Sequence, residues 1–349
     1  MTEVISKPRL NKYDNIKGLA IILIVIGHLL VIKDSGEGFN YIAYLKNVLF
    51  IIHLPLFFFI AGYFSKIRPN DPIKACKRIL IPYIIFCILL RIYFTVLSGK
   101  IKSDPIIIIS EYGLWFLISL FSMKMSLPIV DKLKYPILTS IALGLAIGFL
   151  DISPGLLGIS RTFTYLPVFL TGFYFNTYKE KYIANNKKLN DIVKSKSMEI
   201  CYIVLITIAI LLMAYVCPIK FIRYTSHYNL TNLHFVKEIV GRLILIVLQI
   251  GLVLIANKLM TNKRTILTKI GINSMAIYLL HLFIKKPFLY LIKLFNINDP
   301  TIQLICTLAL SAVIVLVLSR DFVSKYLNKF TDGIYSIFFK PVDSLFTEK

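Results

Sequence analysis

Long apolar segments separated by short polar stretches follow one another along almost the whole chain. Most of them approach the length of about 20 residues that an α-helix needs to cross a bilayer. The pattern predicts an all-α fold, a polytopic membrane helix bundle of about ten transmembrane helices that forms residues 16–319 of a single domain, 1–349. The predicted helices cover residues 16–33, 42–65, 79–97, 106–127, 136–150, 161–176, 200–217, 238–257, 271–292 and 301–319.

The composition and the distribution of charge give this bundle an orientation. Hydrophobic residues make up 57% of the chain, and its mean hydropathy of +0.75 is far above that of soluble proteins. The net charge is +22, and most of the 40 lysines and arginines fall in polar segments on the side of the N-terminus. Cytoplasmic loops collect such residues, so both termini, including the tail 320–349, are predicted to be cytoplasmic in a multi-pass protein of the cell membrane. Topology accounts for the charge, and a nucleic-acid partner is not needed.

The first predicted helix carries the most informative polar residue. In the segment KYDNIKGLAIILIVIGH, residues 12–28, His28 follows Lys17 after ten apolar or glycine residues. Helical rise places the two residues about 16 Å apart. A histidine at that depth is costly unless it has polar partners or faces a water-filled cavity. His28 is therefore a candidate functional residue, and a hydrogen-bonded packing histidine is the alternative.

Other polar residues lie inside the predicted helices or at their outer ends. Together they predict a polar cavity that opens outward above a basic inner rim. Each also has a plain structural interpretation: the histidines can pack with hydrogen bonds, the arginines can reach the interface, and the glutamate beside the tryptophan can mark a wet helix end. The residues concerned are His53, Arg91, Glu111, Trp115, Arg161, Arg242 and His281, with Lys17, Lys74, Lys77 and Arg78 on the rim.

An ordered set of segments resembles the acyltransferase 3 family of integral membrane acyltransferases. The segments are YDNIKGLAIILIVIGH (13–28), IIHLPLFFFIAGYF (51–64), KACKRILIPYI (74–84), LWFL (114–117), RTFTYLPVFLTGFYF (161–175) and GINSMAIYLLH (271–281). The resemblance implies about ten helices and an enzyme that transfers an acyl group, usually acetyl, from cytoplasmic acyl-CoA to a hydroxyl of a cell-surface or lipid-linked sugar. Many members carry an arginine at the position of Lys17, and lysine keeps its charge but loses its bidentate fork. The family's basic cluster before the third helix is matched by Lys77 and Arg78.

Acyl transfer from a thioester to an alcohol needs a base for the hydroxyl and donors for the developing oxyanion. His28 is the predicted base, because imidazole titrates nearest neutral pH. Asp14 cannot orient it, since helical rise separates the two by about 21 Å, and Glu111 is the candidate orienting carboxylate. Acetyl-CoA is the expected co-substrate, with its phosphates on Lys17, Lys77 and Arg78, and no metal is required. The predicted substrate-binding residues are Arg161, Arg91, His53, His281 and Trp115.

One function of another class fits the same pattern. A transporter or flippase for a glycolipid or lipid-linked sugar would also line its path with histidines and arginines, although no inverted repeat is visible in the sequence. The expected partners are membrane lipid, the carbohydrate acceptor and acyl-CoA, and the oligomeric state stays open. The richness in Ile, Lys and Asn is typical of an AT-rich genome, which favours a bacterial or archaeal source.

Overall fold

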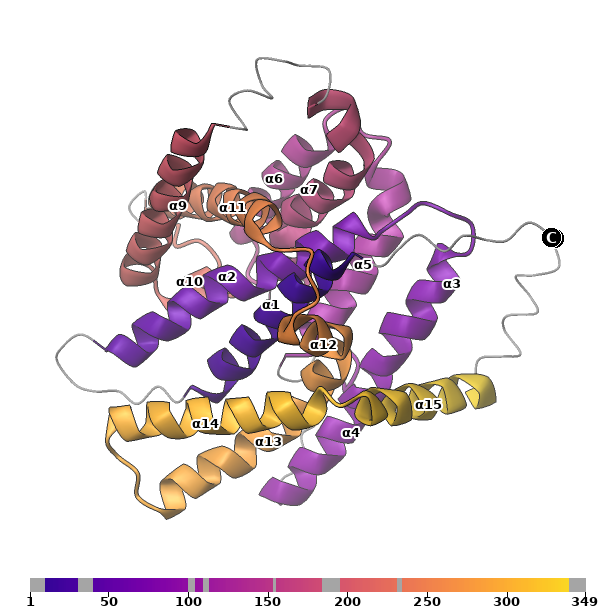
Figure 1. Cartoon of the computed structure of the whole chain (residues 1–349), viewed down its shortest axis with the longest axis vertical. Helices are drawn as coiled ribbons and strands as arrows, with labels where there is room; N and C mark the ends of the chain where they lie inside the picture. The colour runs from indigo at the N-terminus through magenta and orange to yellow at the C-terminus, as the bar shows by residue number, and fades with distance from the viewer. Residues whose placement is uncertain are drawn as a thin grey trace.

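The computed structural model describes residues 10–30, 40–99, 104–108, 113–152, 155–183, 195–230 and 234–338. Within these ranges the fold is all-helical, with no β-strand. Figure 1 shows the helices gathered around α1 and α2. In chain order they are α1 (Asn11–Leu29), α2 (Tyr41–Tyr63), α3 (Asp71–Ala75), the π-helix η1 (Cys76–Leu80), α4 (Ile81–Ser98), α5 (Trp115–Val130), α6 (Pro136–Ala146), the 3₁₀-helix η2 (Ile147–Phe149), α7 (Ile159–Ile183), α9 (Lys196–Val216), α10 (Ile219–Ile222), α11 (His234–Leu259), α12 (Ile266–Ile272), α13 (Ser274–Leu294), α14 (Pro300–Leu318) and α15 (Asp321–Phe338).

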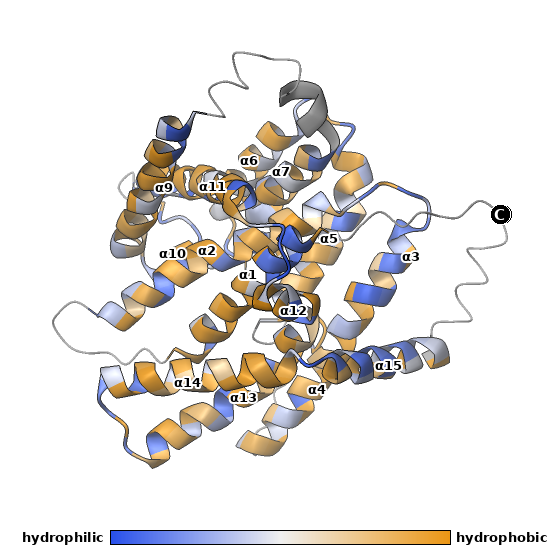
Figure 2. Ribbon diagram, in the orientation of Figure 1, coloured by the Kyte–Doolittle hydropathy of each residue, from blue (hydrophilic) through white to orange (hydrophobic). Residues whose placement is uncertain are grey.

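Six of these helical stretches are long and apolar enough to cross a membrane. In α9, one of the most apolar, only 11% of the apolar 18-residue window is buried, so its outer face presents residues such as Leu205 and Leu212. Figure 2 shows the same apolar character along α11 and α14. A large apolar outer surface is costly in water and is stable in lipid, so the chain is a membrane protein. The six are α2, the continuous stretch Asp71–Ser98, α9, α11, α13 and α14; α5 and Pro136–Phe149 are shorter apolar helices.

The predicted all-α bundle is confirmed, and every predicted helix has a counterpart in the structure. The largest departure is the predicted helix 106–127, because its helical part starts only at Trp115 and residues 106–108 form a turn. This turn is apolar in sequence, but two of its carbonyl groups accept hydrogen bonds from residues far along the chain. The N–H of Leu157 donates to the Ile108 carbonyl at 2.8 Å, and the Tyr83 hydroxyl donates to the Ile107 carbonyl. Satisfied backbone groups allow a turn where hydrophobicity alone predicts a helix.

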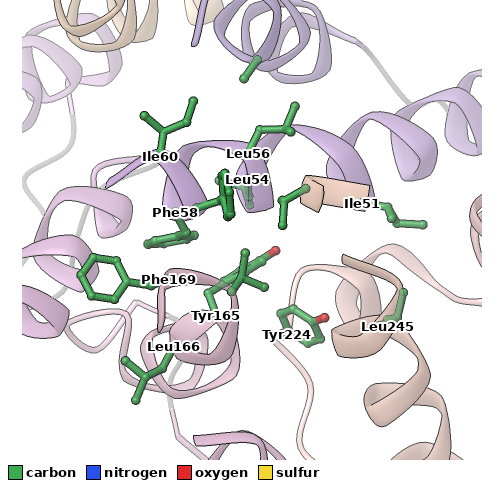
Figure 3. Close-up of a cluster of buried hydrophobic side chains, with 14 of the residues drawn as sticks. Ile51, Leu54, Leu56, Phe58, Ile60, Tyr165, Leu166, Phe169, Tyr224 and Leu245 are labelled. Atoms are coloured by element: carbon green, nitrogen blue, oxygen red, sulfur yellow. The ribbon is translucent and has the colours of Figure 1, made fainter. Parts of the chain in front are cut away.

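Two helix crossings, α2 with α7 and α1 with α12, hold the centre of the bundle together. At the first crossing, aromatic and aliphatic side chains of α2 and α7 interdigitate, as Figure 3 shows for Phe58, Tyr165 and Phe169. The Phe58 and Tyr165 rings are stacked with their centroids 4.9 Å apart. All three side chains are fully buried. This packing fixes α2, which carries several of the residues of the site described below.

Glycines allow both crossings to be this close. A Cβ added at Gly62 would lie 1.8 Å from the Phe169 carbonyl oxygen, and one at Gly172 would lie 2.0 Å from that of Phe59. We expect Gly62→Ala or Gly172→Ala to force α2 and α7 apart and to destabilise the protein by about 3 kcal/mol or more, because backbone cannot move aside as a side chain can. Gly333→Ala on α15 is the control, because a Cβ there meets no described atom within 4 Å. Thermal unfolding in detergent measures the difference, and equal melting of the variants and the control would contradict it.

The segment that follows α14 is helical over residues 321–338. It forms α15, which packs against α4 and α13. Asp332 of α15 pairs with Lys77 at 3.5 Å, and Lys77 also lies over the Tyr335 ring, 4.9 Å from its centroid. The tail therefore contacts the basic segment before α4.

Candidate active site

A small cavity of about 120 Å³ surrounds the His28 side chain. Its walls come from α1, α2, α5, α13 and the residue that follows α10, so helices distant in sequence meet here. The lining residues include His28, Lys46, Phe50, His53, Gly113, Trp115, Phe116, Arg223, Tyr278 and Lys285. We call it the His28 cavity. It brings together three of the residues predicted from sequence: His28, His53 and Trp115.

His281 holds the His28 ring through a chain of hydrogen bonds. The His281 Nδ1 atom lies 2.9 Å from the Ile277 carbonyl, and a carbonyl only accepts, so Nδ1 carries the proton and Nε2 has the lone pair. That Nε2 lies 2.9 Å from His28 Nδ1. Therefore His28 Nδ1–H donates to His281, and the neutral His28 ring carries its lone pair on Nε2. In this tautomer His28 is ready to accept a proton.

Gly113 and Tyr278 shape the space beside this histidine pair. A Cβ added at Gly113 would lie 3.1 Å from His28 Cε1 and 3.5 Å from Leu282, so only glycine leaves the imidazole its present position. The Tyr278 hydroxyl donates to the Gly113 carbonyl and fixes the segment that enters α5. The sequence does not single out either residue, because a lone glycine and a buried tyrosine have no distinctive pattern.

Three cationic side chains line the same cavity. Lys46 comes from α2, Arg223 from the end of α10 and Lys285 from α13. The Lys46 Nζ donates to the Leu30 carbonyl at 2.8 Å, and the Arg223 guanidinium lies over the Phe50 ring, 5.3 Å from its centroid. Burial lowers the pKa of Arg223 below its ordinary value, although an arginine side chain stays protonated in proteins. His281 and Lys285 are four residues apart and lie on one face of a helix, a spacing that could have identified Lys285 from the sequence. No sequence pattern points to Arg223.

The other residues predicted from the sequence differ in their position relative to the His28 cavity. The His53 Nδ1 donates to the Leu49 carbonyl one turn earlier, and its buried Nε2 has no hydrogen-bond partner among the described residues. Trp115 lines the cavity, and the Arg161 guanidinium lies over its ring, 4.3 Å from the ring centroid. Arg91, inside α4, instead donates to the Asp104 carbonyl at 3.1 Å. Glu111 lies outside the described residues.

A second, larger cavity of about 490 Å³ lies at the other ends of α2 and α5. We call it the basic cavity, because five cationic side chains and a single carboxylate line it. The charged residues are Lys66, Arg68, Lys74, Arg78, Lys124 and Asp71. The π-helix η1 contributes Arg78 to this cavity and directs Lys77 toward α15. π-Turns of this kind occur frequently at functional sites.

The structure separates the three residues predicted to bind the CoA phosphates. Arg78 lines the basic cavity, Lys77 contacts Asp332, and the Lys17 Nζ lies 2.7 Å from the carboxylate of Asp14. Arg78 shares the basic cavity with Lys66, Arg68, Lys74 and Lys124. Lys66, Arg68 and Lys74 belong to the basic segment between the second and third predicted helices, whereas Lys124 comes from α5. Charge alone does not show which basic residues face one cavity.

Comparison with known proteins identifies the family. A family model described as an acyltransferase domain matches residues 10–320. The chain belongs to the acyltransferase 3 family. The resemblance inferred from the sequence is therefore confirmed, and the matched residues include both cavities.

Among curated proteins, this acyltransferase 3 chain is similar to the nodulation protein NolL of Sinorhizobium fredii (strain NBRC 101917 / NGR234). The two are 28% identical in an alignment of 179 positions that covers 47% of this chain and 48% of NolL, so the match spans about half of that relative. No solved structure matches the chain. The chain is thus a membrane protein of the acyltransferase 3 family, with an oriented histidine in one cavity and a set of cations in another.

Proposed function

We propose that the protein is an O-acyltransferase of the cell membrane that moves an acetyl group from cytoplasmic acetyl-CoA to a hydroxyl of a cell-surface or lipid-linked sugar. The observation that carries the proposal is the His28–His281 pair, which leaves a lone pair on His28 Nε2 at the wall of a cavity. Membership of the family supports acyl transfer as the reaction, and His28 provides the general base that an alcohol acceptor requires.

The reaction needs one proton to be taken and returned. His28 Nε2 accepts the proton of the sugar hydroxyl while its oxygen attacks the thioester carbonyl carbon. The negative charge then forms on the carbonyl oxygen, within a cavity lined by Lys285 and Arg223, where a nearby cation stabilises it strongly. The carbon–sulfur bond breaks, and the protonated His28 returns the proton to the departing thiolate. The products are the O-acetylated sugar and free CoA.

The two cavities suit the length of an acyl-CoA. Leu54 lines the His28 cavity and Phe64 lines the basic cavity, which separates them by about 15 Å along α2. On α5 the corresponding residues, Phe116 and Lys124, lie about 12 Å apart. We assign the CoA phosphates to the basic cavity and the pantetheine arm to the path between them, with the basic cavity on the cytoplasmic side.

Removal of charge from the basic cavity should weaken acetyl-CoA binding selectively. We expect the double variant Lys74→Gln/Arg78→Gln to raise the KM for acetyl-CoA by about 10- to 100-fold, because two charge-assisted contacts are lost. The change in kcat should be smaller. A short thioester without phosphates, S-acetyl-N-acetylcysteamine, should react equally with both enzymes. Lys329→Gln on α15 is the control for net charge. An unchanged KM for acetyl-CoA in the double variant would remove the phosphates from this cavity.

The direct test of the function is acetyl transfer itself. Membranes that contain the protein are supplied with radiolabelled acetyl-CoA and glycans from its native host, and alkali-labile label in the glycan fraction is counted against membranes without it. We expect label that depends on the protein. A carrier would instead change the distribution of lipid-linked sugar across the membrane without consuming acetyl-CoA, and that result would replace the proposal.

A further inference from the structure

The His28 cavity has an excess of positive charge. Lys46, Arg223 and Lys285 reach it from three separate elements, and each is partly buried. Among the described residues, none of the three has a carboxylate in an ion pair. The acidic residues that follow α1 and precede α5 in the sequence, Asp34, Glu37 and Glu111, lie outside the described residues. A cavity of about 120 Å³ thus gathers three cations around the reacting histidine.

Such a cluster is costly for the protein alone. Like charges that share a partly desolvated space repel each other more strongly than they do in water. The same arrangement attracts an anion and raises its local concentration, because low-dielectric walls focus the field of the cluster. The cluster therefore indicates that negative charge enters this cavity during the reaction.

The acyl donor and the intermediate do not supply enough of that charge. The oxyanion of a tetrahedral intermediate carries one negative charge and exists only briefly. The phosphates of CoA are separated from the thioester by the whole pantetheine arm, so they cannot share a cavity of this size with a thioester that reacts beside His28. The remaining reactant is the acceptor.

We propose that the acceptor is an anionic glycan, with a carboxylate or phosphate group close to the hydroxyl that is acetylated. This proposal rests on the acyl transfer proposed above. The anionic group lies among Lys46, Arg223 and Lys285 while the hydroxyl faces His28 Nε2. The cluster then selects the acceptor, and the basic cavity selects the donor. Guanidinium and ammonium groups bind both carboxylates and phosphates, so the shared property is the negative charge.

The charge of the labelled product tests the proposal directly. Glycans labelled by the wild-type protein from radiolabelled acetyl-CoA are digested to short oligosaccharides at neutral pH, which keeps the ester, and are separated by anion exchange. We expect the label to be retained by the column. Phosphatase treatment that releases it identifies a phosphate, and retention after phosphatase identifies a carboxylate. Label in the unretained fraction would overturn the proposal, and the negative charge that balances the three cations would then belong to the protein. No label at all would contradict the acyl transfer instead.

Neighbouring lysines on α13 provide a matched pair of variants. Lys285 lines the cavity, whereas Lys286 lies over the Phe94 ring, 4.0 Å from its centroid. We expect Lys285→Gln to raise the KM for the labelled host glycan on the order of tenfold, with the KM for acetyl-CoA unchanged, and Lys286→Gln to leave both unchanged. Lys285→Arg should restore the glycan KM. Because repulsion is relieved, Lys285→Gln should melt no lower than wild type. An unchanged glycan KM in Lys285→Gln would argue against the cluster as the acceptor site.

Discussion

Replacement of His28 by alanine is expected to reduce acetyl transfer by about 10³-fold, with the protein still folded. A positioned general base contributes roughly 10² to 10⁴ in rate, and His28 would serve twice, since it also returns the proton to the thiolate. The side chain is half-buried beside a cavity, and the loss of a side chain there removes few packing contacts. The expected result is therefore a loss of kcat and not of stability.

The measurement is single-turnover transfer from radiolabelled acetyl-CoA by purified protein in lipid nanodiscs, with thermal unfolding followed in parallel. His227→Ala is a matched control, because this histidine is exposed and pairs with Asp151 at 3.1 Å, away from both cavities. His28→Gln extends the test: glutamine keeps a polar group of similar size but cannot take a proton. Transfer that survives in both His28 variants would move the base to another residue, with His53 as the next histidine on the cavity wall.

The sequence predicted the helices and singled out His28 as a candidate because both inferences depend on local physics. Apolar runs of sufficient length form helices whichever neighbours they meet, and the depth of His28 in such a run carries its own energetic cost. The helix boundary near residue 106 was wrong because it depends on distant partners. The Tyr83 hydroxyl and the Leu157 N–H satisfy the turn there, and neither can be identified from a one-dimensional pattern.

The composition of each cavity could not be predicted for the same reason. His28 and His281 are 253 positions apart and meet only through the crossing of α1 with α13. Lys77 and Arg78 are neighbours in sequence, yet the π-helix turns them to different surroundings. Basic residues were recognised as a group, and their division between two cavities depends on rotations about helix axes that hydropathy does not encode.

His281 is predicted from the sequence to bind substrate, but its hydrogen bond to His28 indicates that it positions the base. We expect His281→Ala to lower kcat by about 10²-fold or more and to leave the KM for acetyl-CoA unchanged. Without an acceptor for its Nδ1–H, the neutral His28 ring can place its proton on Nε2, and in that tautomer it cannot accept the proton of the hydroxyl. Loss of tautomer control costs about 10⁴-fold in the serine protease triad, where the partner is a charged carboxylate.

A glutamine at position 281 separates this role from simple packing. Its side-chain carbonyl can accept from His28 Nδ1–H as His281 Nε2 does now, so His281→Gln should recover part of the kcat lost in His281→Ala, whereas His281→Leu, which fills the volume without an acceptor, should not. All three variants are compared at equal amounts of folded protein. If leucine supports transfer as well as glutamine does, His281 only fills space, and the orientation of His28 must come from elsewhere. If only glutamine restores it, one hydrogen bond sets the tautomer on which the proposed chemistry depends.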